Sequence, residues 1–250
     1  MSASLQGRRA LVVGGAGGIG AATARLFAEA GARVAVTHTP RSAEKALALA
    51  ASLPGEGHLA LPADVAETVS LLALRDELAE QFAGALHVLV NAAGFTKPVP
   101  HADLDALDDH LIDRMFEVNW RGQFAAIRTF APMLKASGHG LIVSISSISG
   151  QTGIGSSIAY CAAKAGIDVM TKSLARVLAP TVRVLGVAPG AVDTSFVPGR
   201  GADFNPKTAA ATPLKRVATA EDVAEAVFAC ATSLRFSTGT TVVVDGGRSL

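Results

Sequence analysis

The chain has 250 residues, half of them apolar, which is enough to bury the core of one α/β domain. Its formal net charge is +1, so no overall charge attracts it to nucleic acid or to an anionic membrane surface. The two cysteines form neither a CxxC pair nor a disulfide framework, which indicates a reducing, cytoplasmic setting. We expect no secretion signal and no membrane span, because the apolar start is rich in glycine and no apolar run reaches about 18 residues.

Short β-branched segments alternate with helix-length segments along the whole chain. Seven segments have the composition of buried strands, at residues 10–13, 34–37, 59–62, 87–90, 141–145, 182–187 and 241–244. Helical patterns lie between them, at residues 19–30, 67–82, 108–136, 158–178 and 220–232. This alternation predicts a Rossmann-type α/β fold: a doubly wound, seven-stranded parallel sheet with helices on both faces, forming a single domain over residues 1–250.

One long segment, residues 193–213, shows neither pattern. It contains Pro198, Gly199, Gly201, Pro206 and Pro213. Irregular segments of this length are usually functional or disordered. We therefore expect an irregular loop that closes over the substrate as a lid.

A glycine-rich turn joins the first strand to the first helix. It contains Gly14, Gly17, Gly18, Ile19 and Gly20. Glycines let a backbone approach a pyrophosphate closely, and amides at a helix N-terminus then bind its charge. The spacing GxxxGxG differs from the general GxGxxG fingerprint, and tight packing without a ligand is the alternative. The turn nevertheless predicts a dinucleotide site.

The end of the second strand indicates which dinucleotide is used. An acid about 20 residues beyond the glycine turn would bind the adenosine ribose 2′-hydroxyl, but His38 stands there and the first carboxylate is Glu44. Thr39, Arg41 and Ser42 could instead bind a 2′-phosphate. The sequence thus favours NADP, with NAD possible, unless Arg41 only caps or solvates the next helix.

Tyr160 and Lys164 lie four positions apart in a helical pattern, so they share one helix face. A nearby ammonium favours the tyrosinate, and we therefore expect Lys164 to lower the pKa of the phenol from its usual value near 10. Tyr160 would then serve as a general acid or base. It is the only tyrosine in the chain, although an exposed helix face is the alternative for an isolated pair of this kind.

Together these motifs resemble the classical short-chain dehydrogenase/reductase family, and in particular its 3-oxoacyl-carrier-protein reductases. The turn from Val13 to Gly20 matches the family's TGxxxGIG motif, with Val13 in place of the threonine. Further matches cover most of the chain: an adenine-contacting pair Asp64 and Val65, an NAAG motif made of Asn91, Ala92, Ala93 and Gly94, the helix asparagine Asn119, the serine Ser147, and a nicotinamide-cradling segment with Pro189, Gly190, Val192 and Thr194. Asp64 could alternatively be a helix cap.

The resemblance implies hydride transfer between a nicotinamide cofactor and a carbonyl or alcohol carbon. In the reductive direction Tyr160 would protonate the oxygen, Ser147 would hold it, Lys164 would bind the nicotinamide ribose, and Asn119 would position a water. Ser146 competes with Ser147 for the serine role, but the offset from Tyr160 favours Ser147. An NAD-linked catabolic alcohol dehydrogenase and a non-catalytic dinucleotide-sensing protein remain alternatives.

A partly apolar substrate pocket is expected after Gly94, after Ser147 and in the 193–213 segment. Its predicted lining residues are Phe95, Ile148, Gln151, Ile154, Phe196 and Phe204. Lys97 and Arg200 would favour an anionic substrate if they faced this pocket, or else form solvated surface. We expect no metal site, because the acidic and histidine-containing stretch at 101–110 lacks an HExxH pattern. The helices at 108–136 and 157–179 resemble those with which the family pairs subunits, which implies a homotetramer or a dimer.

Overall fold

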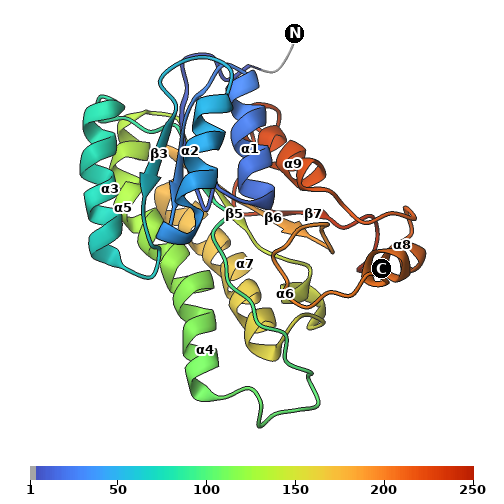
Figure 1. Ribbon diagram of the computed structural model, residues 1–250. Helices are drawn as coiled ribbons and strands as arrows, with labels where there is room; N and C mark the ends of the chain where they lie inside the picture. The colour runs from blue at the N-terminus through green and yellow to red at the C-terminus, as the bar shows by residue number, and fades with distance from the viewer. Residues whose placement is uncertain (1–3) are drawn as a thin grey trace.

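The computed structural model describes residues 4–250, and in this part of the chain seven strands form one parallel sheet (Figure 1). The strands are β1 (Arg9–Val13), β2 (Arg33–His38), β3 (Leu59–Pro62), β4 (Val88–Asn91), β5 (Gly140–Ile145), β6 (Val182–Pro189) and β7 (Thr241–Val244). Their order is β3-β2-β1-β4-β5-β6-β7, so the winding reverses between β1 and β4. The predicted doubly wound fold is confirmed, and such a reversal is where open α/β sheets bind ligands.

The helices between the strands largely follow the predicted pattern. They are α1 (Gly18–Glu29), α2 (Ala43–Ser52), α3 (Thr68–Gln81), α4 (Asp109–Phe116), α5 (Gly122–Ala136), α6 (Ser149–Thr152), α7 (Ile158–Leu178), α8 (Phe204–Ala211) and α9 (Ala220–Thr232). The bounds of α7 and α9 agree with the predicted ones. Helix α2 is an addition to the predicted set, and η1 (Pro40–Ser42), a short 3₁₀ turn, leads into it.

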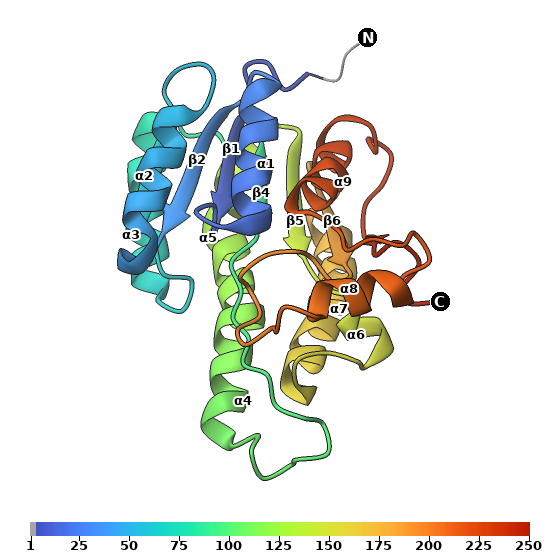
Figure 2. The same ribbon diagram turned by 45° about the vertical axis from the view of Figure 1, so that its right-hand side comes forward.

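Alternate residues of each strand enter opposite layers of the core. Ala10 and Val12 pack with α1, α2 and α9, whereas Leu11 and Val13 pack with α3, α5 and α7. Figures 1 and 2 show these two sets of helices on the two faces of the sheet. Phe27 in the first layer and Phe130 in the second are completely buried, and each such side chain is worth roughly 1.5–3 kcal/mol.

The predicted helix over 108–136 is divided into two helices. Asp108 caps α4 by accepting a hydrogen bond from the Leu111 amide at 2.7 Å, and η2 (Glu117–Arg121), a π-helical turn, then separates α4 from α5. Such a turn widens the helix locally and is frequent at functional sites. Here it contains Asn119, whose side chain has partners outside the helix.

The 193–213 segment was predicted to be irregular. This prediction is wrong for part of the segment, because residues 204–211 form α8. Pro206 is the third residue of α8, in the first turn, where an amide has no partner within the helix and proline is tolerated. In Figure 2, α8 crosses the molecule near the lower ends of β5 and β6. The segment therefore lies at the edge of the sheet where ligands are expected.

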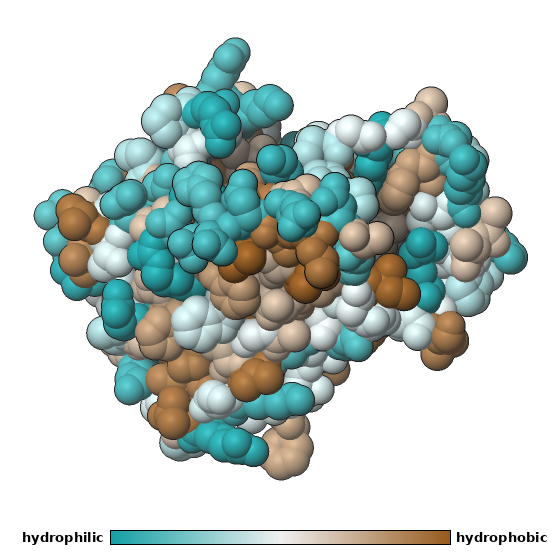
Figure 3. Space-filling model, turned by 90° about the horizontal axis from the view of Figure 1, so that it is seen from below, coloured by the Kyte–Doolittle hydropathy of each residue, from teal (hydrophilic) through white to brown (hydrophobic). Residues whose placement is uncertain are grey.

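Within the described residues, no helix has both the length and the apolar character needed to cross a bilayer. Figure 3 shows the molecule from below, with hydrophobic patches among hydrophilic side chains. Exposed large apolar residues on the helices predicted to pair subunits include Phe116, Ile158, Val169 and Val177.

Candidate active site

A cleft of about 1410 Å³ opens at the carboxyl ends of the strands. Most of the predicted site residues line it: Gly14, Gly17, Gly18, Ile19, Gly20, His38, Thr39, Arg41, Ser42, Asp64, Val65, Ala92, Gly94, Phe95, Ser147, Ile148, Ile154, Tyr160, Lys164, Pro189, Gly190, Val192, Thr194 and Phe196. Phe204 also lines the cleft. Asn91, Asn119 and Gln151 do not. The topology has thus brought residues from six strand ends into one cavity.

The glycine turn is built around a close approach of two strand ends. Gly14 has a φ of +76°, and a Cβ there would lie 2.6 Å from the Ala93 backbone, so a side chain cannot be accommodated. The Gly14 amide donates to Thr37 Oγ1 at 2.9 Å, a contact that the glycine spacing does not predict. A Cβ at Gly17 would meet nothing within 4 Å. The turn is therefore fixed by Thr37 at Gly14 and open toward the cleft at Gly17, as a pyrophosphate site at the N-terminus of α1 requires.

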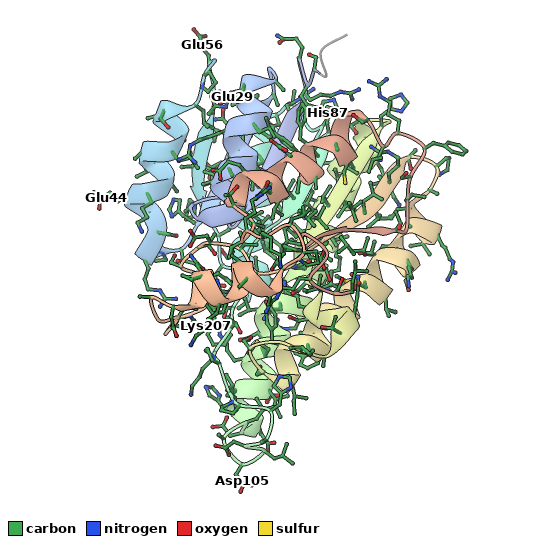
Figure 4. All side chains as sticks on the ribbon, turned by 90° about the vertical axis from the view of Figure 1, so that its right-hand side faces the viewer. Glu29, Glu44, Glu56, His87, Asp105 and Lys207 are labelled. Atoms are coloured by element: carbon green, nitrogen blue, oxygen red, sulfur yellow. The ribbon has the colours of Figure 1, made fainter. Side chains whose placement is uncertain are left out.

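The region after β2 presents two cations to the cleft. Arg41 is exposed there, and Lys45, one turn along, also lines the cavity. Sequence reasoning missed Lys45, although its i, i+4 spacing from Arg41 was visible. Figure 4 shows Glu44 pointing outward from α2, and it does not line the cleft. Ser42 is partly engaged, since its hydroxyl accepts a hydrogen bond from the Thr39 amide at 3.2 Å.

Asp64 stabilises its own turn as well as lining the cleft. Its Oδ1 accepts a hydrogen bond from the Ala66 amide at 2.9 Å, and its amide donates to Ser70 Oγ at 3.0 Å. The cap of α3 is Glu67, so the alternative that Asp64 caps this helix is wrong. These hydrogen bonds hold the turn that carries Val65, which also lines the cleft.

Asn119 and Asn91 act beneath the cleft. The Asn119 side chain donates from Nδ2 to the carbonyls of Phe95 at 2.8 Å and Met115 at 2.9 Å, and its Oδ1 accepts from the Phe95 amide at 3.2 Å. It therefore clamps the loop after β4. Asn91 is buried in the sheet beside Ser144. Asn119 therefore positions backbone that faces the cavity, whereas the Asn91 side chain hydrogen-bonds only the Ser144 side chain among the described residues.

Ser147, Tyr160 and Lys164 meet at the centre of the cleft. Ser147 follows β5, while the other two lie on α7, whose first turn is capped by Ser157 accepting from the Tyr160 amide at 3.2 Å. Lys164 Nζ lies 5.5 Å from the centroid of the Tyr160 ring and donates to the Ile145 carbonyl at 2.8 Å. Ser146 instead donates to the Lys164 carbonyl at 3.2 Å, which gives it a structural contact.

Burial dominates the electrostatics of this group. It raises the pKa of the Tyr160 phenol, while the Ser147 hydroxyl and the positive charge of Arg200 act in the opposite direction. The expected lowering of the Tyr160 pKa is therefore not found, because desolvation of the phenolate outweighs every favourable contact. Burial also lowers the pKa of Lys164 to about 8, and the Asp168 carboxylate, one turn along α7, opposes this shift.

The substrate end of the cleft is partly apolar. Phe196 packs against Tyr160 with ring centroids 6.2 Å apart, and Ile148 and Ile154 line the wall nearby. Gln151 was predicted to join them but is exposed outside the cavity. It lies on α6, a single short helix turn with Gly153 (φ +70°) as its C-cap, and the other face of this turn, with Ser149 and Thr152, lines the cleft instead.

Comparisons with known proteins identify the family of the chain. Residues 14–249 match the family described as enoyl-(acyl carrier protein) reductase. The chain is 41% identical to cis-4-hydroxycyclohexanecarboxylate dehydrogenase of Sinomonas cyclohexanicum, over 96% of each chain. It is 33% identical to 3-oxoacyl-[acyl-carrier-protein] reductase of Staphylococcus aureus, covering 96% of this chain and 97% of that protein.

A solved short-chain type dehydrogenase/reductase from Mycobacterium ulcerans superposes with a TM-score of 0.89 at 28% identity, covering 98% of this chain and 91% of that one. The chain therefore belongs to the short-chain dehydrogenase/reductase family. It is an NAD(P)-dependent oxidoreductase that acts on carbonyl or alcohol substrates.

Proposed function

We propose that this protein is an NADP-linked oxidoreductase of ketones and secondary alcohols, with Tyr160 as its acid and base. The convergence of Ser147, Tyr160 and Lys164 on the same cleft as the open glycine turn carries this proposal. A phenol, a hydroxyl and an ammonium at one point can handle a proton and a developing alkoxide. They stand at the sheet edge where a dinucleotide would lie.

In reduction, the carbonyl carbon gains a hydride and its oxygen gains a proton. A nicotinamide bound between the glycine turn and the segment at 189–194 would supply the hydride. Tyr160 would donate its phenolic proton to the oxygen, and Ser147 would donate a hydrogen bond to the same atom. The Lys164 ammonium would stabilise the phenolate left behind and so counteract part of the desolvation that opposes its formation. Oxidation of an alcohol would reverse each step.

The preference for NADP rests on Arg41 and Lys45. Both line the cleft after β2, where a ribose-binding carboxylate would otherwise repel a 2′-phosphate. Replacing Arg41 with glutamine should lower kcat/KM for NADPH about 10- to 100-fold relative to NADH, by loss of charge-assisted hydrogen bonds. The matched control is Glu44→Gln, which changes a neighbouring charge outside the cleft and should leave the ratio unchanged. A wild-type preference for NADH above tenfold would refute this part.

The activity itself can be tested with a panel of ketones and both reduced nucleotides. The Sinomonas relative is named for a ring alcohol that carries a carboxylate. We therefore include 4-oxocyclohexanecarboxylate, its amide and simple neutral cyclic ketones. Oxidation of nucleotide that depends on a ketone would support the proposal. Tight nucleotide binding without turnover of any ketone, or of the matching alcohols in reverse, would indicate a dinucleotide-sensing protein instead.

We also propose a homotetramer that pairs through α4, α5 and α7, with the 193–213 segment acting as a substrate lid. The homotetramer is supported by Val169 and Val177, which are 62% and 70% exposed on α7. Large apolar side chains exposed on one helix indicate a contact surface. Light scattering after size-exclusion chromatography tests it. A monomeric mass at micromolar concentration would contradict the assembly.

A further inference from the structure

Arg200 occupies a fixed place within the 193–213 segment. Its Nη1 donates to the Val192 carbonyl at 2.7 Å, and its Cζ lies 4.1 Å from the centroid of the Phe204 ring. A guanidinium stacked on an aromatic face keeps its edge free for hydrogen bonds. The side chain is half-buried and lines the cleft. Arg200 is therefore not a freely solvated surface residue.

Its charge has no ionic partner in the described part of the chain. No carboxylate oxygen lies within 4.0 Å of its nitrogens, and Nε is buried without any hydrogen-bond partner. The negative charge of Asp193 raises the pKa of Arg200 without an ion pair between them, and Asp193 Oδ1 accepts a hydrogen bond from Asn205 at 2.9 Å. A buried donor left unsatisfied is costly. An incoming acceptor would relieve that cost.

Arg200 also lies close enough to Tyr160 for their charges to interact. Its positive charge lowers the pKa of the Tyr160 phenol, although burial raises it more strongly. Arg200 thus lies near the reacting centre, in the same 193–213 segment as the Phe196 ring that packs on Tyr160. The region after β2, where Arg41 and Lys45 lie, belongs to a different part of the sheet.

We propose that Arg200 binds a carboxylate of the substrate, so that the enzyme selects oxo acids and hydroxy acids over neutral ketones and alcohols. This inference rests on the proposed function and names its substrate class. A planar guanidinium with a free edge matches a carboxylate in a two-point contact. The single positive charge of this guanidinium would balance the charge of one carboxylate. With the carboxylate held at Arg200, the carbonyl would face Tyr160 from across the substrate.

The test compares two substrates that differ in charge but hardly in shape. The enzyme is assayed with NADPH on 4-oxocyclohexanecarboxylate and on its primary amide, and the ratio of the two kcat/KM values is measured. Wild type should favour the acid at least about tenfold. Arg200→Gln should lower this ratio about 10- to 100-fold. The ratio for Arg200→Lys should lie between those of wild type and Arg200→Gln.

Lys207 provides the matched control. It is a second cation of the same segment that lines the cleft, but its ammonium is paired with Asp203, and Figure 4 shows it on α8. Lys207→Gln should leave the acid-to-amide ratio within about twofold of wild type. An equal loss in both variants would mean that general attraction, and not a specific contact, selects the acid, and would overturn the proposal.

Other results are equally decisive. A wild-type enzyme that reduces the acid and the amide equally well overturns the inference about Arg200 but leaves the proposed function standing. An Arg200→Gln variant whose ratio is unchanged while its KM for NADPH rises assigns Arg200 to a cofactor phosphate instead, and also overturns the inference. An enzyme that turns over no ketone with either nucleotide refutes the proposed function, and the inference falls with it.

Discussion

The floor and the roof of the cleft are built differently. The floor consists of the glycine turn, the loop after β4 and the first turns of α7, and buried side chains such as Thr37 and Asn119 bind its backbone directly. The roof is the 193–213 segment, whose residues are mostly exposed or half-buried. The difference suggests that the floor fixes the chemistry, while the roof can vary to select the substrate.

The sharpest way to break this comparison is to remove the proton donor from the floor. Tyr160→Phe deletes only the hydroxyl, so turnover should fall by about 10²–10⁴-fold while the dissociation constant for NADPH stays nearly the same. Stopped-flow hydride transfer and fluorescence titration of NADPH measure the two effects. Turnover within tenfold of wild type would show that another group supplies the proton.

The rigidity of the floor can be tested at Asn119. Asn119→Ala removes the partners of the Phe95 amide and carbonyl, which should lower the free energy of unfolding by about 2–3 kcal/mol. Urea unfolding measures this change. Asn205→Ala, which removes an exposed side-chain contact from the roof, should cost less than about 0.5 kcal/mol. Equal losses would mean that floor and roof are equally fixed.

A roof contact should affect substrate binding more than chemistry. Phe196→Ala removes the ring that packs on Tyr160, so KM for a ketone should rise several-fold, roughly the worth of a partly buried aromatic contact. The fully exposed Phe236 offers the control, because Phe236→Ala should leave KM unchanged. A large fall in kcat with unchanged KM would place Phe196 with the chemistry of the floor.

The smallest expected effect is a shift in pH dependence. Burial lowers the pKa of Lys164 to about 8, and the Asp168 carboxylate opposes that shift. Asp168→Asn should lower the pKa further, so Lys164 loses its proton at lower pH and the reductive rate should decline at lower pH than in wild type. Profiles of kcat/KM against pH measure the shift. Asp105→Asn, at the tip of the molecule in Figure 4, is the control. If the pH at which the rate declines stays the same in Asp168→Asn, or rises, Asp168 does not raise the pKa of Lys164 as proposed.

The sequence predicted the strands and most of the floor because local patterns determine them. Buried strands are continuous apolar runs, and Gly14 is required by a close backbone approach that no other residue permits. The π-helical turn at Asn119 escaped prediction, because helix periodicity does not reveal a contact with the distant Phe95 backbone. The pKa of Tyr160 was expected in the wrong direction, since helix spacing reveals the nearby cation but not the depth of burial. Gln151 was wrongly predicted to line the pocket, and α8 was missed, because the sequence pattern does not reveal how α6 and the roof fold over the end of the sheet.

The strand order has a practical consequence for redesign. Four strand spacings of about 4.8 Å each, roughly 19 Å in all, separate the end of β2, which leads to the cations proposed to recognise the 2′-phosphate, from the end of β6, which leads to the roof. Substitutions at such a separation usually contribute independently to free energy. Coenzyme choice and substrate choice could then be changed one at a time in this enzyme and combined without mutual interference.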